Sequence, residues 1–129
     1  MADEHLGEGV AFPPRVGARG LAGSAGLARV EESIRIILGT QHGERVMRPH
    51  FGANLKSLIF AANNATTASL ASYYVKDALD RWEPRIDVLD VLVSNDVQRG
   101  LLVIEIRYRL RATAQEHVFV LPFALERAR

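Results

Sequence analysis

The clearest pattern in the chain is an alternation of apolar and charged residues at positions 101–111. Apolar residues occupy even positions, namely Leu102, Ile104, Ile106, Tyr108 and Leu110. Charged residues occupy odd positions, namely Glu105, Arg107, Arg109 and Arg111. Successive side chains of a strand point to opposite faces, so a period of two predicts a β-strand with one buried and one solvated face.

Two further strands flank this one. The segment 86–93 is rich in β-branched residues, and its alternation changes phase near Val88 and Leu89, which predicts a β-bulge. The chain returns over positions 117–125 with apolar residues on both faces. Strands that follow one another through short turns usually pair in order, so we expect an antiparallel three-stranded β meander.

Before the strands, apolar residues recur at helical spacing. One stripe consists of Leu27, Val30, Ile34, Ile37 and Leu38. It predicts an amphipathic helix over residues 27–39, which Gly39 ends. Polar and turn-forming residues follow, and a short helix is predicted over residues 54–62.

A longer helix is predicted next, with Thr66 or Thr67 as its cap and Trp82 near its end. Its expected buried stripe is Leu70, Tyr74, Val75, Ala78, Leu79 and Trp82. Pro84 ends the helix, because the residue before a proline disfavours helical angles.

The opening 26 residues differ from the rest. Glycine recurs every third residue from Gly17 to Gly26, without the prolines of collagen or the Gly-Lys-Ser/Thr of a phosphate loop. We expect either a mobile arm over residues 1–26, anchored at Phe12, or a plain connector. The domain proper spans 27–129. Its predicted class is α+β, with amphipathic helices packed on a small antiparallel three-stranded β meander.

Composition and charge exclude several function classes. The 129 residues are 48% hydrophobic and 24% charged, which is typical of one folded domain. Sixteen basic residues balance 15 acidic ones, which leaves no basic field for nucleic acid or an anionic membrane. No apolar run approaches the ~20 residues of a membrane span, and the acidic start does not predict a signal peptide. We expect a cytoplasmic protein with neither kind of partner.

Residues for catalysis or cofactor binding form no recognisable set. The chain has no cysteine, and its four histidines lack the spacing of metal ligands. A glycosidase needs two carboxylates about 5 to 9.5 Å apart, for which Glu44 and Glu83 are the conceivable pair. Each adjoins arginine, and nearby positive charge disfavours the protonated acid that the reaction needs. We expect no enzymatic activity, catalytic residue, cofactor or metal site.

The turn after the long helix is a candidate interface. Trp82 anchors the helix end and Pro84 fixes the exit of the chain, so Glu83 and Arg85 lie on a stiff turn. A rigid turn loses little entropy on docking, and arginine offers a planar fork to carboxylates or carbonyls. The alternative is that Glu83 and Arg85 tie the turn to its own domain, through an arginine of an earlier loop.

The meander is a second candidate interface, because an open sheet has two edges that can accept an added strand. Pro122 fits only an edge strand or a bulge, so we predict that 117–125 is the outer strand. Its two apolar faces require a cover, either from a partner or from another segment of the same chain. The arginine face of the 101–111 strand is expected to be solvated, with an acidic partner as the alternative.

Several short segments together resemble one known family. They are Phe12-Pro13-Pro14, Ile37-Leu38-Gly39-Thr40, Gly43-Glu44-Arg45-Val46-Met47, Arg48-Pro49-His50-Phe51-Gly52 and Glu83-Pro84-Arg85, with Leu55 and Phe60. Their order and spacing are similar to those of the small baseplate wedge protein, or sheath initiator, of contractile phage tails. Counterparts occur in type VI secretion and extracellular contractile injection systems. The resemblance covers residues 9–123.

The resemblance implies an α+β structural protein that docks on the core bundle of the baseplate wedge and nucleates the sheath by β-strand addition. The implied partners are core-bundle proteins and the first ring of sheath subunits, with tube or spike-hub proteins as further candidates. It implies six copies per particle, assembled in the cytoplasm. The expected partner-binding residues are Glu83, Pro84 and Arg85, the facing loop residues Gly43, Glu44, Arg45, Arg48 and Pro49, and Leu121 and Phe123 on the outer strand.

Two other functions stay open at this point. A distant relative of the family is a stress-response anti-adaptor, so a regulatory protein-binding module is one alternative. Members have also been labelled lysozymes, which makes peptidoglycan cleavage the other, and the missing acid–base pair argues against it.

Overall fold

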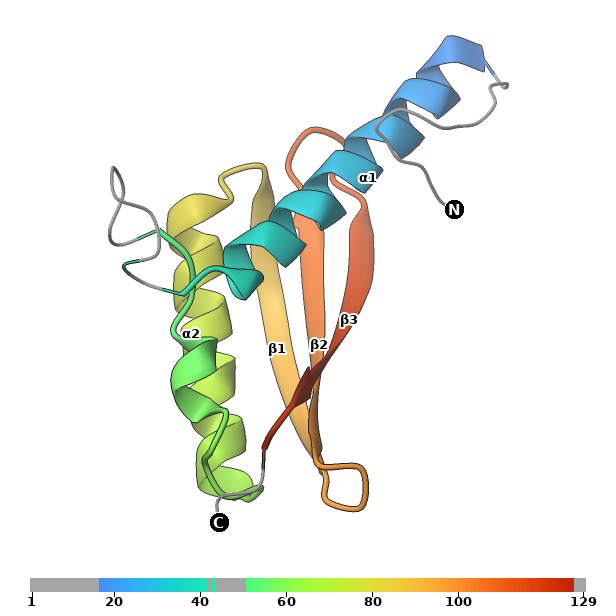
Figure 1. Ribbon diagram of the computed structural model, residues 1–129. Coiled ribbons are helices and arrows are strands. Elements are labelled where there is room, and N and C mark those ends of the chain that lie inside the picture. Colours follow the sequence, from blue (N-terminus) through green and yellow to red (C-terminus); the bar gives the residue numbers. More distant parts are fainter. Residues whose placement is uncertain (1–16, 42, 44–50, 127–129) are drawn as a thin grey trace. The chain divides into compact units, whose positions relative to one another are not determined.

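The computed structural model describes residues 17–41, 43 and 51–126 (Figure 1). The chain divides into two compact units, residues 1–35 and 36–129, which we describe separately. The described part of the first unit is helical and belongs to α1 (Gly17–Gly39), whose last turn lies in the second unit. The remaining elements, all in the second unit, are η1 (Leu55–Leu58), α2 (Ala65–Trp82), β1 (Ile86–Asp96), β2 (Leu101–Leu110) and β3 (Glu116–Ala124).

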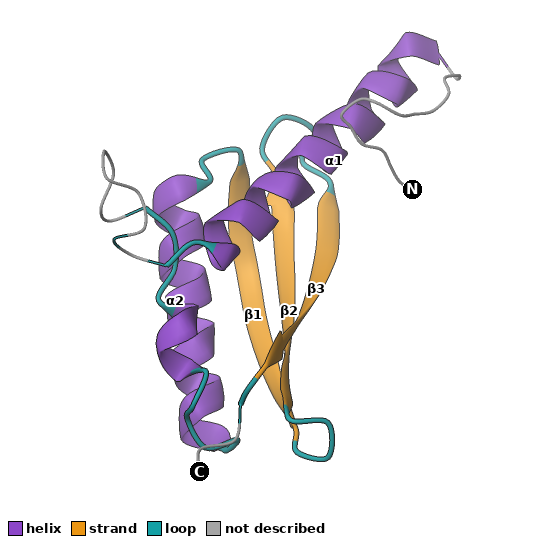
Figure 2. Cartoon of the chain, viewed as in Figure 1, coloured by secondary structure: helices purple, strands orange, loops and turns teal. Residues whose placement is uncertain are grey.

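The strands form one antiparallel sheet in the order β1-β2-β3 (Figure 2). Ile106 in the middle of β2 lies opposite Val91 of β1 and Phe119 of β3. The register of β1 shifts between Val88 and Asp90, so the strand is bulged there. The predicted α+β class, the meander, the bulge and the outer position of the third strand are confirmed.

The core of the second unit lies on one face of the sheet. Leu102, Ile104, Ile106 and Tyr108 alternate along β2 and are fully buried. α2 runs alongside β1 (Figure 1), packs against it and buries Val75 and Leu79. The period-two pattern of β2 therefore supplies one wall of the core, and the helical stripe of α2 supplies another.

The buried stripe of α2 differs from the predicted one at its beginning. Leu70 is 40% exposed, whereas Ala68 and Ala71 are buried. Small side chains on the inner face let a helix come close to the sheet, which leaves the larger leucine outside. The cap also differs, because the side chain of Asn64, and not that of a threonine, accepts the N–H of Thr67 at 3.0 Å.

The two earlier helices differ from prediction in length. α1 begins at Gly17, ahead of the predicted start at 27, because alanine, leucine and arginine between the glycines favour helix. The predicted helix over 54–62 is only the four-residue 3₁₀ helix η1, in which Leu55 and Leu58 are buried. A spacing of three places both leucines on one side of a 3₁₀ turn. Phe12, the predicted anchor of the arm, lies outside the described residues.

Within the described ranges, none of the helices has the length and apolar character needed to cross a membrane.

Candidate protein-interaction sites

The turn after α2 combines a buried carboxylate with a half-exposed guanidinium. The N–H of Glu83 donates to the carbonyl of Leu79 at 3.0 Å, which is the last i to i−4 hydrogen bond of α2, and the Glu83 side chain is 2% exposed. Arg85 donates to both carboxylate oxygens, from Nε to Oε1 at 2.8 Å and from Nη2 to Oε2 at 2.9 Å. This is the strong bidentate geometry, and the Arg85 side chain keeps 49% of its surface exposed.

Backbone contacts hold this turn in place. The N–H of Arg85 donates to Glu83 Oε1 at 3.3 Å, and the N–H of Arg111 donates to the carbonyl of Arg85 at 3.0 Å. The side-chain hydrogen bonds to Glu83 raise the pKa of Arg85, partial burial opposes this rise, and the negative charge of Glu83 adds to it. Arg85 is therefore a permanent positive charge on a preorganised turn.

The base of the loop between α1 and η1 is closely packed. The N–H of Ala53 donates to the carbonyl of Thr40 at 2.8 Å, and Gln41 Nε2 donates to Asn54 Oδ1 at 2.6 Å. Gly52 has φ +103°, and an added Cβ would collide with the Thr40 carbonyl. The two ends of the loop are therefore fixed against each other.

The same loop base contacts the end of α2. The rings of Phe51 and Trp82 lie 5.2 Å apart between centroids, next to the start of the Glu83 turn. Gly43 is exposed with φ +91°, a left-handed conformation that glycine adopts easily. The other loop residues predicted to bind partners, Glu44, Arg45, Arg48 and Pro49, lie outside the described residues.

β3 carries apolar side chains on both faces, as predicted. Phe119 is buried, and Leu121 and Phe123 lie opposite Ile104 and Leu102 of β2. The predicted partner-binding residues Leu121 and Phe123 thus share the core face of the sheet and are half-buried. The other face of β3 presents Val118 and Val120, which are 53% and 54% exposed.

The arginine face of β2 is solvated, and acidic residues of the same sheet accompany it. Arg107 Nε lies 3.1 Å from a Glu105 carboxylate oxygen. Arg109 and Arg111 both approach Asp87, at 3.8 and 2.8 Å. These ion pairs are exposed and stabilise the fold little, by less than about 1 kcal/mol each. This face of the sheet therefore carries both positive and negative charges.

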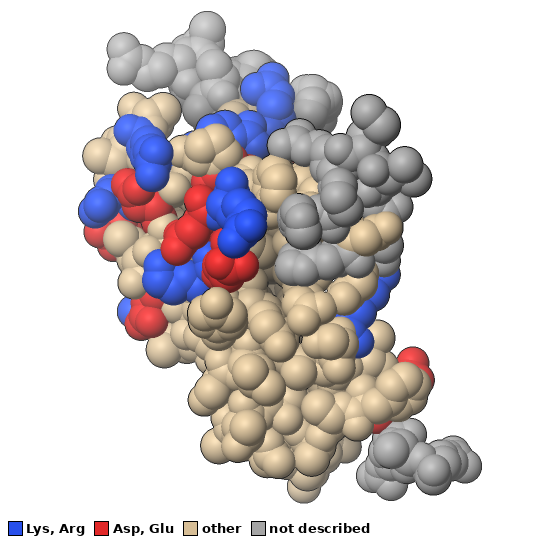
Figure 3. Space-filling view, turned by 90° about the vertical axis from the view of Figure 1, so that its left-hand side faces the viewer, with Lys and Arg blue, Asp and Glu red and all other residues tan. Residues whose placement is uncertain are grey.

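Figure 3 views the side of the molecule on which α2 lies. Basic and acidic side chains intermingle in its upper part, and its lower part is mostly uncharged. The pairs on α2 lie in its second half, with Lys76 2.9 Å from Asp80 and Arg81 3.7 Å from Asp77. The first half, from Ala65 to Tyr74, has no charged residue.

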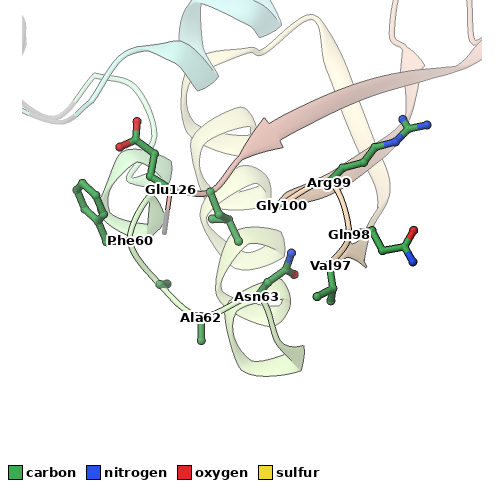
Figure 4. A pocket seen from close by; sticks show the side chains of 10 residues that line it. Phe60, Ala62, Asn63, Val97, Gln98, Arg99, Gly100 and Glu126 are labelled. Carbon is green, nitrogen blue, oxygen red and sulfur yellow. The ribbon is translucent and has the colours of Figure 1, made fainter. Parts of the chain in front are cut away.

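A hollow of about 520 Å³ lies at the end of the sheet opposite the Glu83 turn. Three segments line it, residues 60–63, 97–100 and 125–126 (Figure 4). Phe60 and Val97 are its large exposed apolar residues, and Glu126 is its one carboxylate. The hollow includes none of the predicted site residues. Among the described residues, no three His, Asp or Glu side chains group as a metal site would require.

The sequence pattern of the family described as "Baseplate wedge protein gp25" matches residues 24–115. The chain is 33% identical over 85 residues to the baseplate wedge protein gp25 of Enterobacteria phage T4. That match covers 66% of this chain and 64% of the phage protein, which is less than two thirds of the relative's length.

Solved structures share the fold. One is the crystal structure of a protein from Geobacter sulfurreducens that is named a tail lysozyme. Its TM-score is 0.74 and its sequence is 45% identical, and the match covers 82% of this chain and 96% of that one. A chain of the post-contraction baseplate of pyocin R2 has a TM-score of 0.51 at 24% identity, with coverages of 77% and 85%. A chain of the anti-feeding prophage baseplate has a TM-score of 0.54, also at 24% identity, with coverages of 90% and 83%.

Proposed function

Because the chain belongs to the family of baseplate wedge protein gp25, we propose that it is a structural component of the baseplate of a contractile injection machine. In this proposal the protein docks on the core bundle of the wedge and nucleates the sheath. The sheath begins when a subunit of its first ring adds a strand to the sheet of this protein.

The open edge of β3 is the observation that carries this proposal. The described sheet ends at β3, so the main chain on its outer side is available to another strand. The opposite edge strand, β1, is partly engaged, since Ser72 of α2 donates to the carbonyl of Val91 at 3.1 Å and the N–H of Val91 donates to Asp90. We therefore assign strand addition to β3. Each added main-chain hydrogen bond contributes about 1 kcal/mol net.

The turn at residues 83–85 is the proposed contact with the wedge core. Preorganisation supports this assignment, because Glu83 and Pro84 hold the charged guanidinium of Arg85 at the surface before any partner binds. Gly43, Glu44, Arg45, Arg48 and Pro49 are proposed to complete this contact, since the base of their loop touches the end of α2 through Phe51 and Trp82.

The proposed role of Leu121 and Phe123 is to support the edge strand from its core face. The further proposed features are six copies per particle, contacts with tube or spike-hub proteins, and assembly in the cytoplasm before incorporation into the baseplate.

We propose that the protein is not an enzyme. The carboxylate of Glu83, one of the two conceivable catalytic acids, is buried and bonded at both oxygens to Arg85, so it is poorly placed to donate a proton to a sugar. Purified protein should release no reducing sugar from peptidoglycan under conditions in which a known lysozyme does. Sugar release by the protein would contradict this part of the proposal.

Reconstitution of assembly tests the main proposal. Baseplate wedges prepared without this chain are mixed with tube and sheath subunits, and the particles are examined by electron microscopy. We expect bare tubes without the chain, and sheathed tubes when the purified chain is added first. Sheaths of normal length and frequency in its absence would overturn the proposal.

A further inference from the structure

Hydrogen bonds at the two ends of the β2–β3 pair show which residues of β3 turn their main chain outward. At one end the N–H of Leu110 donates to the carbonyl of Gln115 at 2.9 Å, and at the other the N–H of Leu125 donates to the carbonyl of Gly100 at 2.8 Å. Residues of an antiparallel strand alternately bond to the neighbour and face away from it. The register between these ends is unbroken, so odd-numbered residues of β3 bond to β2. The outward-facing residues are Glu116, Val118, Val120, Pro122 and Ala124.

These outward groups make no main-chain hydrogen bond within the described part of the chain. Val118 and Val120 each offer an N–H and a carbonyl, and an antiparallel neighbour can form hydrogen bonds with both groups. Pro122 offers a carbonyl alone, because proline has no N–H. The edge therefore presents outward donors at Glu116, Val118 and Val120, lacks one at Pro122, and has one more at Ala124.

The side chains along this edge are mostly apolar. Glu116 is the only charged residue of β3, although edge strands are commonly protected by charges along their length. Val118 and Val120 are half-exposed on the outer face, and Phe119 and Leu121 occupy the core face. A strand added beside them is flanked by apolar surface above and below.

From this geometry we propose that β3 receives an extended segment that bonds to Val118 and Val120 and carries uncharged, apolar side chains on both of its faces. Pro122 interrupts the shared ladder by withholding the next donor, so it limits the continuous run of donors to the part of β3 before it. The inference rests on the proposed function, in which the segment belongs to a sheath subunit.

Neighbouring residues of β3 direct their main-chain groups to opposite sides, so proline substitutions at adjacent positions test different hydrogen bonds. Val120→Pro removes an outward N–H, introduces a ring on the open edge and leaves every bond to β2 intact. Leu121→Pro, one residue along, removes an N–H that bonds to β2 and should destabilise the sheet itself. Pro122→Val restores the missing outward donor. Urea unfolding followed by circular dichroism shows which variants keep the fold.

Binding of purified sheath subunit to the full chain is then measured by titration. We expect Val120→Pro to keep the fold and to weaken binding at least tenfold, and Pro122→Val to strengthen it several-fold. Wild-type affinity in a folded Val120→Pro variant would overturn the inference and leave strand addition elsewhere possible. Failure of the wild-type chain to bind sheath subunit at all would instead contradict the proposed function.

Amide hydrogen exchange gives a readout that needs no variant. In the free chain the amides of Val118 and Val120 should exchange rapidly, whereas those of Phe119 and Leu121 should be protected. Addition of sheath subunit should slow exchange at Val118 and Val120 by tenfold or more. Unchanged exchange there, in a complex shown to form, would overturn the inference even if Val120→Pro failed to fold.

Discussion

Glu83 and Arg85 act as one unit, because the guanidinium of Arg85 compensates the buried negative charge of Glu83 through two hydrogen bonds. The carboxylate is almost completely buried, and it accepts two hydrogen bonds from the guanidinium. We expect Arg85→Ala to lower the free energy of unfolding by about 1–3 kcal/mol, since it removes two charged side-chain donors from a buried carboxylate. Arg85→Lys keeps the charge but not the fork, so it should lose less.

Urea denaturation measures this difference, and the double variant Glu83→Gln with Arg85→Ala is the control. Removal of the buried charge together with its partner should recover part of the stability lost in Arg85→Ala. Equal stability of Arg85→Ala and the wild type would show that the pair contributes nothing to the fold.

Gly52 is a second residue whose position depends on its lack of a side chain. Its φ of +103° and its contact with the Thr40 carbonyl leave no room for a Cβ. Gly52→Ala should therefore destabilise the second unit by about 1–3 kcal/mol. Gly39→Ala is the matched control, because a Cβ there meets nothing within 4 Å, and it should be neutral or slightly stabilising. Thermal unfolding of both variants checks the prediction, which equal loss at both glycines would contradict.

Among the secondary-structure elements, α2 depends on a single side chain for its start. Asn64 has extended angles, and its oxygen accepts the N–H of Thr67. We expect Asn64→Ala to cost about 1 kcal/mol and Asn64→Asp to cost less, because aspartate also caps helices. The exposed Thr66→Ala is the control, and it should be near neutral. Urea unfolding measures the stability of both variants. A larger loss of stability for Thr66→Ala than for Asn64→Ala would show that Asn64 is not the cap.

The elements also show what could be predicted from the sequence and what could not. The β2 strand was predictable because ten residues of alternating polarity have only one explanation, and Pro122 restricted β3 to an edge. The start of α1 does not follow from the glycines before Leu27, which predict a connector, because the helix-favouring residues between them let the helix begin at Gly17. The inner face of α2 does not follow from side-chain size, because Ala68 and Ala71 are the small residues that allow the helix to pack close to the sheet.

For the candidate site, the limits have a different physical origin. The 83–85 turn was recognisable from proline and charge, but the burial of Glu83 follows from packing that no local pattern encodes. The outward residues of β3 follow from the parity of its pairing with β2, and a register is set by the whole hairpin. Hence Leu121 and Phe123, which the sequence predicts to bind a partner, lie on the core face of β3.

Within the second unit as a whole, hydrogen bonds connect the turn to the edge strand. The carbonyl of Arg85 accepts from Arg111 at the end of β2, and the adjacent Leu110 donates to Gln115 at the start of β3. A contact at the turn and a strand added to β3 therefore share one bonded sheet. Such a sheet can carry load between two partners without changing its own conformation, since many main-chain bonds resist shear together.

This arrangement predicts that the two proposed contacts are energetically independent. Arg85→Lys should weaken docking on wedge proteins while sheath-subunit binding stays at the wild-type level, and Val120→Pro should do the reverse. In the double variant, the binding free energy for each partner should match that of the corresponding single variant within about 0.5 kcal/mol, as for distant sites on a rigid scaffold. Titration of each partner separately measures both affinities, with circular dichroism confirming the fold. If either folded single variant lost both partners, the turn and the edge would instead be coupled through a change in the sheet, and the rigid scaffold would have to be abandoned.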